Sequence, residues 1–192
     1  LGSVNTLIAP AKLRTLSHNN PIKENAGLKV YEDPQPESGY VLVADVSRGI
    51  TSDYSAFVVM DVSEIPYRQV AVYRDNEIKP MNFPQIIHRV ASAYNLAYVM
   101  VEINDIGEQV SELLHFDFEY DNLLFTESAG RSGKRISAGF SKRCDKGIRT
   151  TKTVKSVGCS ILKLLIEQDQ LIINDFQTIK ELSTFSRKRN SF

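Results

Sequence analysis

Three short apolar runs in the first half of the chain predict three β-strands. The runs cover residues 40–46, 55–62 and 67–73, and the last alternates Val70 and Val72 with polar or small neighbours. The connections between the runs are short and polar. Short connections favour antiparallel pairing, because parallel neighbours need a crossover of about a dozen residues or more. We therefore expect an antiparallel meander in this part of the chain.

The hydrophobic period changes after the meander from that of a strand to that of a helix. Apolar residues at helical spacing predict a helix over residues 83–94, and the run at 96–103 predicts a fourth strand. A strand–helix–strand crossover implies parallel pairing. The other expected elements are a helix over 107–116, a strand over 122–126, a helix over 154–165, a short strand over 171–173 and a helix over 176–185, with a glycine-rich basic loop or hairpin over 127–150.

This order of elements predicts an α/β fold, with three antiparallel strands followed by βα units in a mixed sheet flanked by helices. The order is that of the ribonuclease H/resolvase-like arrangement, in which the first and fourth strands lie side by side at the middle of the sheet. Residues 1–30 show weak periodicity, and we interpret them as a linker or arm from a preceding domain. Residues 31–192 would then form the folded domain, which is long enough for one good-sized core.

Composition narrows the class of protein. The chain contains 24% charged and 42% hydrophobic residues, as ordinary soluble domains do. No apolar run approaches the roughly 18 residues of a membrane span, so we expect no membrane partner. The two cysteines, Cys144 and Cys159, have neither the spacing of a metal site nor that of an obvious disulfide. A reducing cytoplasm fits these features best.

Two acids at the ends of predicted strands are the main candidates for chemistry. Asp45 ends the first strand and Glu102 ends the fourth, and the expected fold places these strands next to each other. A carboxylate in such a place must be exposed, paired or bound to a cation, because burying a bare charge is costly. Two of them predict a site for one or two Mg²⁺ ions, with Mn²⁺ as an alternative, of the kind that supports phosphodiester hydrolysis.

Two further acids are weaker candidates, and each acid has a simpler interpretation. Asp53 returns toward the site at the start of the second strand, where it could orient a metal-bound water, but it is also a typical turn residue. Asp105 follows the fourth strand and is expected to cap the next helix, with Glu108 three residues later as in a capping box. Asp45 could instead cap a turn, and Glu102 could pair with a basic side chain.

The net charge of zero conceals a strongly basic segment. Nine basic residues and one acid give residues 131–155 a charge of +8, which leaves −8 for the rest of the chain. Such segregation favours a surface that faces a polyanion, although a solvated loop and helix face is the alternative. Residues 128–135 fail the pattern of a phosphate-binding loop at both ends, so they carry no ATPase signature. The basic residues that we assign to binding double-stranded DNA are Arg131, Lys134, Arg135, Lys142, Arg143, Lys146 and Arg149.

Two acid motifs, in this order, resemble a known family. Residues 43–49 read Val-Ala-Asp-Val-Ser-Arg-Gly, residues 53–55 read Asp-Tyr-Ser, and residues 101–107 read Val-Glu-Ile-Asn-Asp-Ile-Gly. Together they resemble the nuclease domain of the large terminase subunit, the DNA-packaging protein of T-even-like tailed bacteriophages. The resemblance extends from about Tyr40 to the end of the chain.

The resemblance implies a Mg²⁺-dependent endonuclease that cuts concatemeric double-stranded DNA during viral genome packaging, with little sequence preference. It implies that Asp45 and Glu102 are catalytic metal ligands and that Asp53 is a nearby acid of lesser role. It also implies three partners: an ATPase motor domain in the full-length chain, the portal and the small terminase subunit. The protein would act in the cytoplasm of the host.

The chain departs from this family at one important position. The family's third catalytic aspartate follows a Gly-x-His-Asp-Asp-like segment near the carboxyl end, which these 192 residues lack, and Asp175 does not match it. We therefore expect the carboxy-terminal part of the domain to be truncated. Two other functions stay open: a module that binds DNA without cutting it, and a phosphotransferase of the actin/sugar-kinase type. The latter would need a second Gly-rich phosphate loop, which we do not find.

Overall fold

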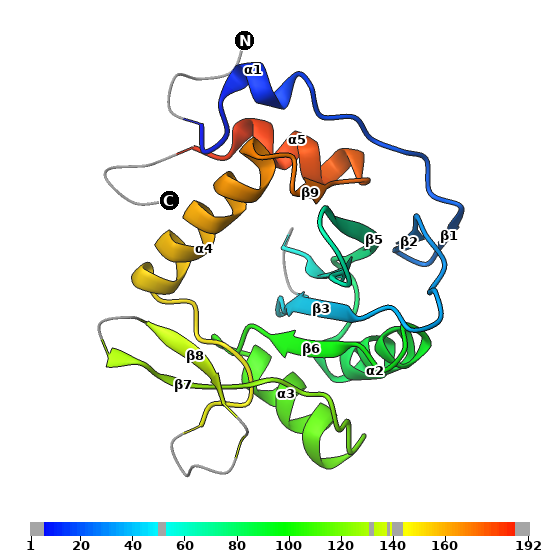
Figure 1. Ribbon diagram of the computed structural model, residues 1–192. Helices are drawn as coiled ribbons and strands as arrows, with labels where there is room; N and C mark the ends of the chain where they lie inside the picture. The colour runs from blue at the N-terminus through cyan, green and yellow to red at the C-terminus, as the bar shows by residue number, and fades with distance from the viewer. Residues whose placement is uncertain (1–5, 50–52, 131–132, 138, 140–143, 187–192) are drawn as a thin grey trace.

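A mixed β-sheet forms the centre of the molecule (Figure 1). The computed structural model describes residues 6–49, 53–130, 133–137, 139 and 144–186. Within them the strand order is β1-β2-β5-β4-β3-β6, with β9 pairing with β5 in addition. The strands are β1 (Lys23–Asn25), β2 (Leu28–Val30), β3 (Tyr40–Asp45), β4 (Ser55–Asp61), β5 (Tyr67–Asp75), β6 (Tyr98–Val101) and β9 (Leu171–Ile172).

The strand pairing confirms the predicted α/β fold and its ribonuclease H-like order. The three strands β3, β4 and β5 form the antiparallel meander. The fourth strand of the prediction, β6, lies parallel to β3 and pairs with it from Val41↔Tyr98 to Ala44↔Val101. The carboxyl ends of β3 and β6 therefore meet at the same edge of the sheet, next to each other.

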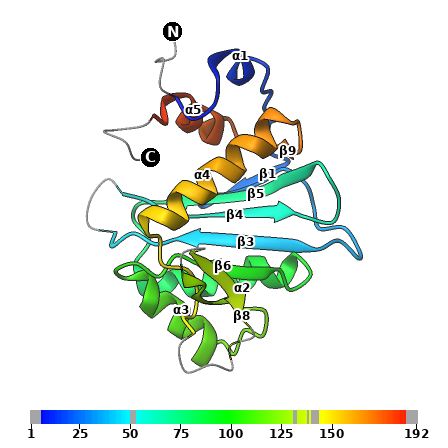
Figure 2. The ribbon, with the colours of Figure 1, turned by 60° about the vertical axis from the view of Figure 1, so that its left-hand side comes forward.

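Helices lie on both sides of this sheet (Figure 2). On one side are α2 and α3, and on the opposite side are α4 and α5, with α1 packed beside α5. The helices are α1 (Pro10–Leu13), α2 (Phe83–Ala93), α3 (Gly107–Phe116), α4 (Lys152–Glu167) and α5 (Phe176–Thr184), and a 3₁₀ turn, η1 (Pro80–Asn82), precedes α2. None of the described helices is both long and apolar enough to cross a membrane.

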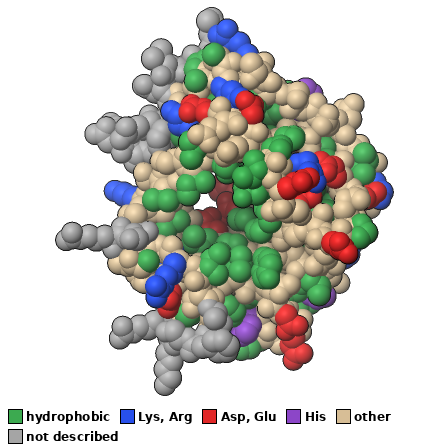
Figure 3. Space-filling model, viewed as in Figure 1, with side chains coloured by type: hydrophobic (Ala, Val, Ile, Leu, Met, Phe, Trp, Pro, Cys, Tyr) green, Lys and Arg blue, Asp and Glu red, His purple; other side chains and the backbone are tan. Residues whose placement is uncertain are grey.

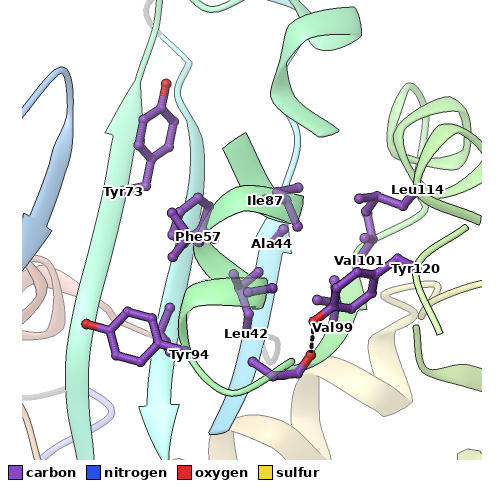
Figure 4. Close-up of a cluster of buried hydrophobic side chains, with 14 of the residues drawn as sticks. Leu42, Ala44, Phe57, Tyr73, Ile87, Tyr94, Val99, Val101, Leu114 and Tyr120 are labelled. Carbon is purple, nitrogen blue, oxygen red and sulfur yellow. Dashed lines mark hydrogen bonds between the residues drawn. The ribbon is translucent and has the colours of Figure 1, made fainter. Parts of the chain in front are cut away.

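The main core fills the space between the sheet and α2 and α3 (Figure 4). Alternation along β3 buries Leu42 and Ala44 against these helices. Phe57 of β4 stacks on Tyr73 and Phe83, with ring centroids 5.1 and 6.1 Å apart. The same alternation turns Val43 and Asp45 to the other face of the sheet. The burial of Leu42 and Ala44 in the core thus determines the direction in which the Asp45 side chain points.

The edge of the sheet beyond β6 differs from the prediction. The expected strand over residues 122–126 lies later, as β7 (Phe125–Ser128), and forms a separate hairpin with β8 (Lys134–Ser137). The edge of β6 is instead shared by two segments, because Val99 bridges Leu123 and Glu102 bridges Ile148. A glycine, Gly147 at φ +126°, allows the second segment to come close to the β6 backbone.

A second, smaller core joins α4, α5 and the start of the described chain. Its buried residues are Leu7, Ile8, Ile166, Ile173 and Leu182. The described part of residues 1–30 therefore packs on the rest of the protein, and β1 and β2 extend the sheet. The derivation of this segment from an interdomain linker stays a prediction. The expected helix over 154–165 is confirmed as part of α4, but its apolar stripe Val157, Ile161 and Leu164 is about half exposed, at 49%, 52% and 50%.

A buried polar network fastens α5 to β5. The side-chain oxygen of Gln69, which is 2% exposed, accepts hydrogen bonds from the backbone N–H groups of Asn174 and Asp175, at 3.0 and 2.8 Å. The carboxylate of Asp175 in turn caps α5 by accepting from Thr178 N–H at 2.7 Å, and it accepts from the Tyr31 hydroxyl at 2.8 Å. Gln69 thus satisfies two buried donors that have no place in the strand ladder.

Replacing Gln69 by alanine should destabilise the fold. The substitution leaves two buried N–H groups without an acceptor, and each such group costs roughly 1–3 kcal/mol. We expect Gln69→Ala to lower the free energy of unfolding by about 2–4 kcal/mol in urea denaturation. The control is Gln109→Ala on the exposed face of α3, which should stay within about 0.5 kcal/mol of the parent. Equal stability of the two variants would contradict this account of α5.

Candidate metal centre

Asp45 and Glu102 lie next to each other at the carboxyl ends of two adjacent parallel strands. Asp45 is the last residue of β3, and Glu102 directly follows β6. The backbone N–H of Glu102 donates to the carbonyl oxygen of Ala44 at 2.8 Å, which continues the β3–β6 ladder by one residue. Both side chains leave the sheet on the face opposite the main core, because their neighbours Ala44 and Val101 are fully buried.

The two carboxyl groups are close enough to perturb each other. Partial burial, a hydrogen bond with Glu102 and the negative charge of Glu102 raise the pKa of Asp45 to about 6, and the charge of Asp53 adds to the increase. The raised pKa of Asp45 therefore reflects a carboxyl group that is partly removed from water and lies beside other acids. Carboxylate oxygens are the ligands that Mg²⁺ and similar ions prefer.

The position of Glu102 is set by residues that the sequence analysis did not identify. The side-chain amide of Asn104 donates to Glu102 Oε1 at 3.0 Å and to the carbonyl oxygen of Thr150 at 3.3 Å. Gly107, the first residue of α3, packs so closely that a Cβ on it would lie 1.9 Å from the Glu102 carbonyl oxygen. In the sequence, these two roles were indicated only by closeness to Glu102, which Asn104 follows by two residues and Gly107 by five.

The two weaker acid candidates have different surroundings. Asp53 lines the same groove as Asp45, and its charge contributes to the raised pKa of Asp45. Asp105 forms a bidentate ion pair with Arg48. The prediction that Asp105 caps the following helix is wrong: Ile106 occupies the N-cap position without a side-chain cap, and Asp105 sits one residue earlier at φ +53°.

Asp45 lines a groove of about 1140 Å³ on the face of the sheet opposite α2 and α3. Figure 3 shows the corresponding hollow, with acidic side chains deep inside it and hydrophobic side chains around it. Asp45, Asp53 and Asp105 line it at the ends of β3 and β6, and Asp175 and Glu181 line it from the side of α5. The groove is therefore a wide acidic cleft that a cation can enter.

No cluster of three or more metal-binding side chains occurs within the described ranges. Asp45 and Glu102 thus form a pair, with Asp53 beside them as a contributor of charge. Asp175, the late acid considered in the sequence, lies in the same groove but is engaged in capping α5. Two carboxylates can hold a divalent ion that keeps part of its water shell, which is how Mg²⁺ is commonly bound.

The described residues of the basic segment are largely paired with acids. Lys134 pairs with Asp145 at 2.6 Å, and Arg135 pairs with Glu127 at 2.7 Å. Lys146 and Arg149 pair with Glu112 and Glu108 of α3, at 3.9 and 3.1 Å. The other predicted DNA contacts, Arg131, Lys142 and Arg143, lie outside the described residues. Lys146 and Arg149 thus attach the segment that follows the hairpin to α3, and Lys134 attaches the hairpin to that segment, so these basic residues also have a structural role.

A family model identifies the fold from the sequence. The model described as the terminase RNaseH-like domain matches residues 42–190. This range contains Asp45 and Glu102 and most of the sheet, and it covers well over half of the chain.

Solved structures with the same fold include nucleases of the three phages G20c, P74-26 and P22. The large terminase nuclease of thermophilic phage G20c with bound magnesium has a TM-score of 0.71 at 19% identity, over 98% of this chain and 86% of that chain. The large terminase nuclease domain of Thermus phage P74-26 has a TM-score of 0.65 at 21% identity, over 98% and 83%. The P22 large terminase nuclease domain has a TM-score of 0.52 at 14% identity, over 99% and 83%.

Adding a methyl group at Gly107 should disturb Glu102. A Cβ at this position would overlap the Glu102 carbonyl oxygen, so either α3 or the end of β6 has to move. We expect Gly107→Ala to lower the free energy of unfolding by roughly 1–3 kcal/mol in urea denaturation. Gly158→Ala is the matched control: it lies within α4 with no atom near its added methyl group and should stabilise the protein by about 0.5–1 kcal/mol. A Gly107→Ala variant as stable as the parent would show that the close approach has no consequence.

The acid pair also predicts how stability depends on pH without divalent cations. The pKa of Asp45 is about 6 in the folded protein, compared with an ordinary value of 3.8. The folded state therefore binds the proton of the Asp45 carboxyl group more tightly than the unfolded state does. The contribution of Asp45 to stability is therefore highest near pH 4 and is lost as the pH rises through about 6. Asp45→Asn should raise the melting temperature at pH 7–8 in EDTA, and the gain should shrink toward pH 4. Asp121→Asn, at an exposed site, controls for the loss of one charge; a gain for Asp45→Asn that did not vary with pH would contradict the prediction.

Proposed function

Because this chain belongs to the terminase RNase H-like domain family, we propose that it is the nuclease domain of a phage large terminase subunit. In this role it cuts concatemeric double-stranded DNA during genome packaging, with little sequence preference and with the help of divalent cations. The observation that carries the proposal is the placement of Asp45 and Glu102 side by side, with the pKa of Asp45 raised by burial and by Glu102. The motif resemblance assigns metal-binding carboxylates to these two positions, and the groove lined by Asp45 is wide enough to admit a large substrate.

Asp45 and Glu102 would hold Mg²⁺, with Mn²⁺ as a second candidate and with one or two ions. Such an ion supplies a water nucleophile at neutral pH and stabilises charge on the phosphoryl oxygens. The residues of the chain have simpler tasks. Asn104 keeps the Glu102 carboxylate oriented, and Asp53 adds negative charge close to Asp45. Structures of the G20c nuclease with bound magnesium, cobalt and zinc support divalent ions as the class of cofactor.

The DNA contacts in the proposal are the basic residues of segment 131–155. Three of them, Arg135, Lys146 and Arg149, lie in ion pairs in which one partner is more than half exposed, whereas the Lys134–Asp145 pair is mostly buried, at 18% and 27% exposure. Solvent-exposed ion pairs contribute little net stability. A basic side chain in such a pair can therefore leave its acidic partner and bind a DNA phosphate at a small cost in free energy. Arg131, Lys142 and Arg143 complete the proposed set.

Family membership supports a wider proposal about the setting of the domain. We propose an ATPase motor domain in the full-length chain, with residues 1–30 leading from it, and the portal and small terminase subunit as partners in the host cytoplasm. The subgroup of T-even-like phages rests on the motifs at Asp45 and Glu102 alone. The solved relatives described above are nucleases of phages G20c, P74-26 and P22.

One observation favours a second candidate function. Since the described residues bring together two carboxylates rather than three, the chain as it stands could bind DNA without cutting it. Nothing in the described structure favours the phosphotransferase alternative. The two remaining candidates differ in a single measurable property, the breaking of a phosphodiester bond.

Plasmid nicking tests the proposal directly. In Mg²⁺ the parent protein should convert supercoiled plasmid to nicked and linear forms, and Asp45→Asn and Glu102→Gln should each reduce the rate by at least about a hundredfold. Binding of labelled duplex in EDTA should be at least as tight as that of the parent, because both substitutions remove negative charge and no DNA contact.

Asp121→Asn, exposed and outside the groove, should cut at the parental rate. Full cutting by Asp45→Asn would contradict the assigned site. Duplex binding without any cutting by the parent protein would favour the non-cleaving module.

A further inference from the structure

An ion pair joins the two loops that follow the acid pair. Arg48 lies three residues after Asp45, and Asp105 lies three residues after Glu102. The guanidinium of Arg48 donates from Nε to Asp105 Oδ2 at 2.5 Å and from Nη2 to Asp105 Oδ1. The contact is therefore side-on and bidentate, which fixes the plane of the guanidinium as well as its position. Both residues line the acidic groove together with Asp45.

The side-on contact leaves most of the hydrogen-bonding capacity of Arg48 unused. A guanidinium has five N–H donors, and Asp105 takes two of them. The two N–H groups on Nη1 and one on Nη2 remain, and no acceptor other than Asp105 is found for them within the described ranges. The Arg48 side chain is 63% exposed and that of Asp105 is 55% exposed, so the free donors can reach a ligand in the groove.

Arg48 differs from the other cations of the groove, Lys29 and Arg74, in its position. Lys29 lies 3.8 and 4.0 Å from the carboxylates of Glu24 and Asp175. Arg74 pairs with Glu181 at 3.0 Å and lies over the ring of Tyr54. Both belong to the end of the groove near α5, whereas Arg48 lies beside the acid pair.

We propose that Arg48 binds a backbone phosphate of DNA in the groove, and that Asp105 is a positioning residue that holds the guanidinium ready for it. The inference rests on the proposed function, because it takes DNA to be the substrate of this groove. The physical need is clear: Asp45, Glu102 and Asp53 repel a polyanion, and a cation beside them offsets this repulsion. The free edge of a guanidinium matches two phosphate oxygens, which a lysine ammonium cannot do.

The role assigned to Asp105 predicts that removing this acid weakens the binding of DNA. On charge alone, removing an acid from a DNA-facing groove tightens binding. If Asp105 positions Arg48, its removal instead weakens binding, because the guanidinium must then be ordered at the moment of binding. Asp105→Asn is the suitable variant, since Asn tolerates the positive φ of this residue while carrying no charge.

Fluorescence anisotropy with a labelled DNA duplex, in EDTA and over a series of salt concentrations, provides the test. Arg48→Ala should weaken binding roughly tenfold and reduce the slope of log K against log salt by about 0.9, the value for one phosphate contact. Arg48→Lys should keep the slope but recover only part of the affinity. Asp105→Asn should weaken binding severalfold in the parent and not at all in the Arg48→Ala background.

The chain offers a matched control in Lys23 and Asp33. They form an ion pair of similar exposure, 65% and 52%, at 2.7 Å and outside the groove. Lys23→Ala and Asp33→Asn should leave the affinity and the salt dependence for duplex unchanged. An unchanged affinity and slope in Arg48→Ala would overturn the phosphate contact, and tighter binding by Asp105→Asn would overturn the positioning role.

Plasmid nicking separates this inference from the proposed function. Arg48→Ala should raise KM for plasmid more than it lowers kcat, because it removes a binding contact rather than a metal ligand. Cutting that depends on Asp45 but not on Arg48 would overturn the inference and leave the nuclease intact. Binding that depends on Arg48, in a parent protein that never cuts, would support the inference and overturn the nuclease.

Discussion

The parallel pairing of β3 with β6 is the constraint on which the candidate site depends. The register that opposes Ala44 and Val101 brings the next residues of the two strands, Asp45 and Glu102, to the same edge and the same face. This register is held by the buried side chains that alternate with the acids, because a slip of one residue would turn the acids into the core. The apolar residues of the strands therefore determine the geometry of the polar site.

The site also shows how the fold accommodates concentrated negative charge. Asp45 and Glu102 lie close enough for one to raise the pKa of the other, while the nearby Asp105 is neutralised by Arg48. The acids at the far end of the groove are neutralised too, by the α5 cap and by Lys29 and Arg74. Among the described acids that line the groove, Asp45 and Asp53 therefore have no basic partner, and a cation would have its largest effect beside them.

Local patterns in the sequence were sufficient for the main elements and for the acid pair. A short apolar run defined β3, a change of period defined α2, and strand order then placed Asp45 beside Glu102. Contacts between distant segments could not be predicted in this way. No periodic pattern in the sequence indicates the Arg48–Asp105 pair or the contact of Asn104 with Thr150, because each of them joins two loops. The basic segment was read as a free surface for the same reason, although its acidic partners lie mostly on α3 and in the hairpin.

The separation of β3 from β6 along the chain also bears on how the protein folds. The meander of β3, β4 and β5 joins neighbours by short turns, whereas β6 reaches β3 only after β5 and α2 have been placed. Contacts of such long sequence separation close a large loop and tend to form late. A chain that has completed only the meander presents Asp45 without Glu102. Any chemistry that needs both carboxylates therefore begins only once β6 has joined the meander, and chains that have not reached this stage are inert.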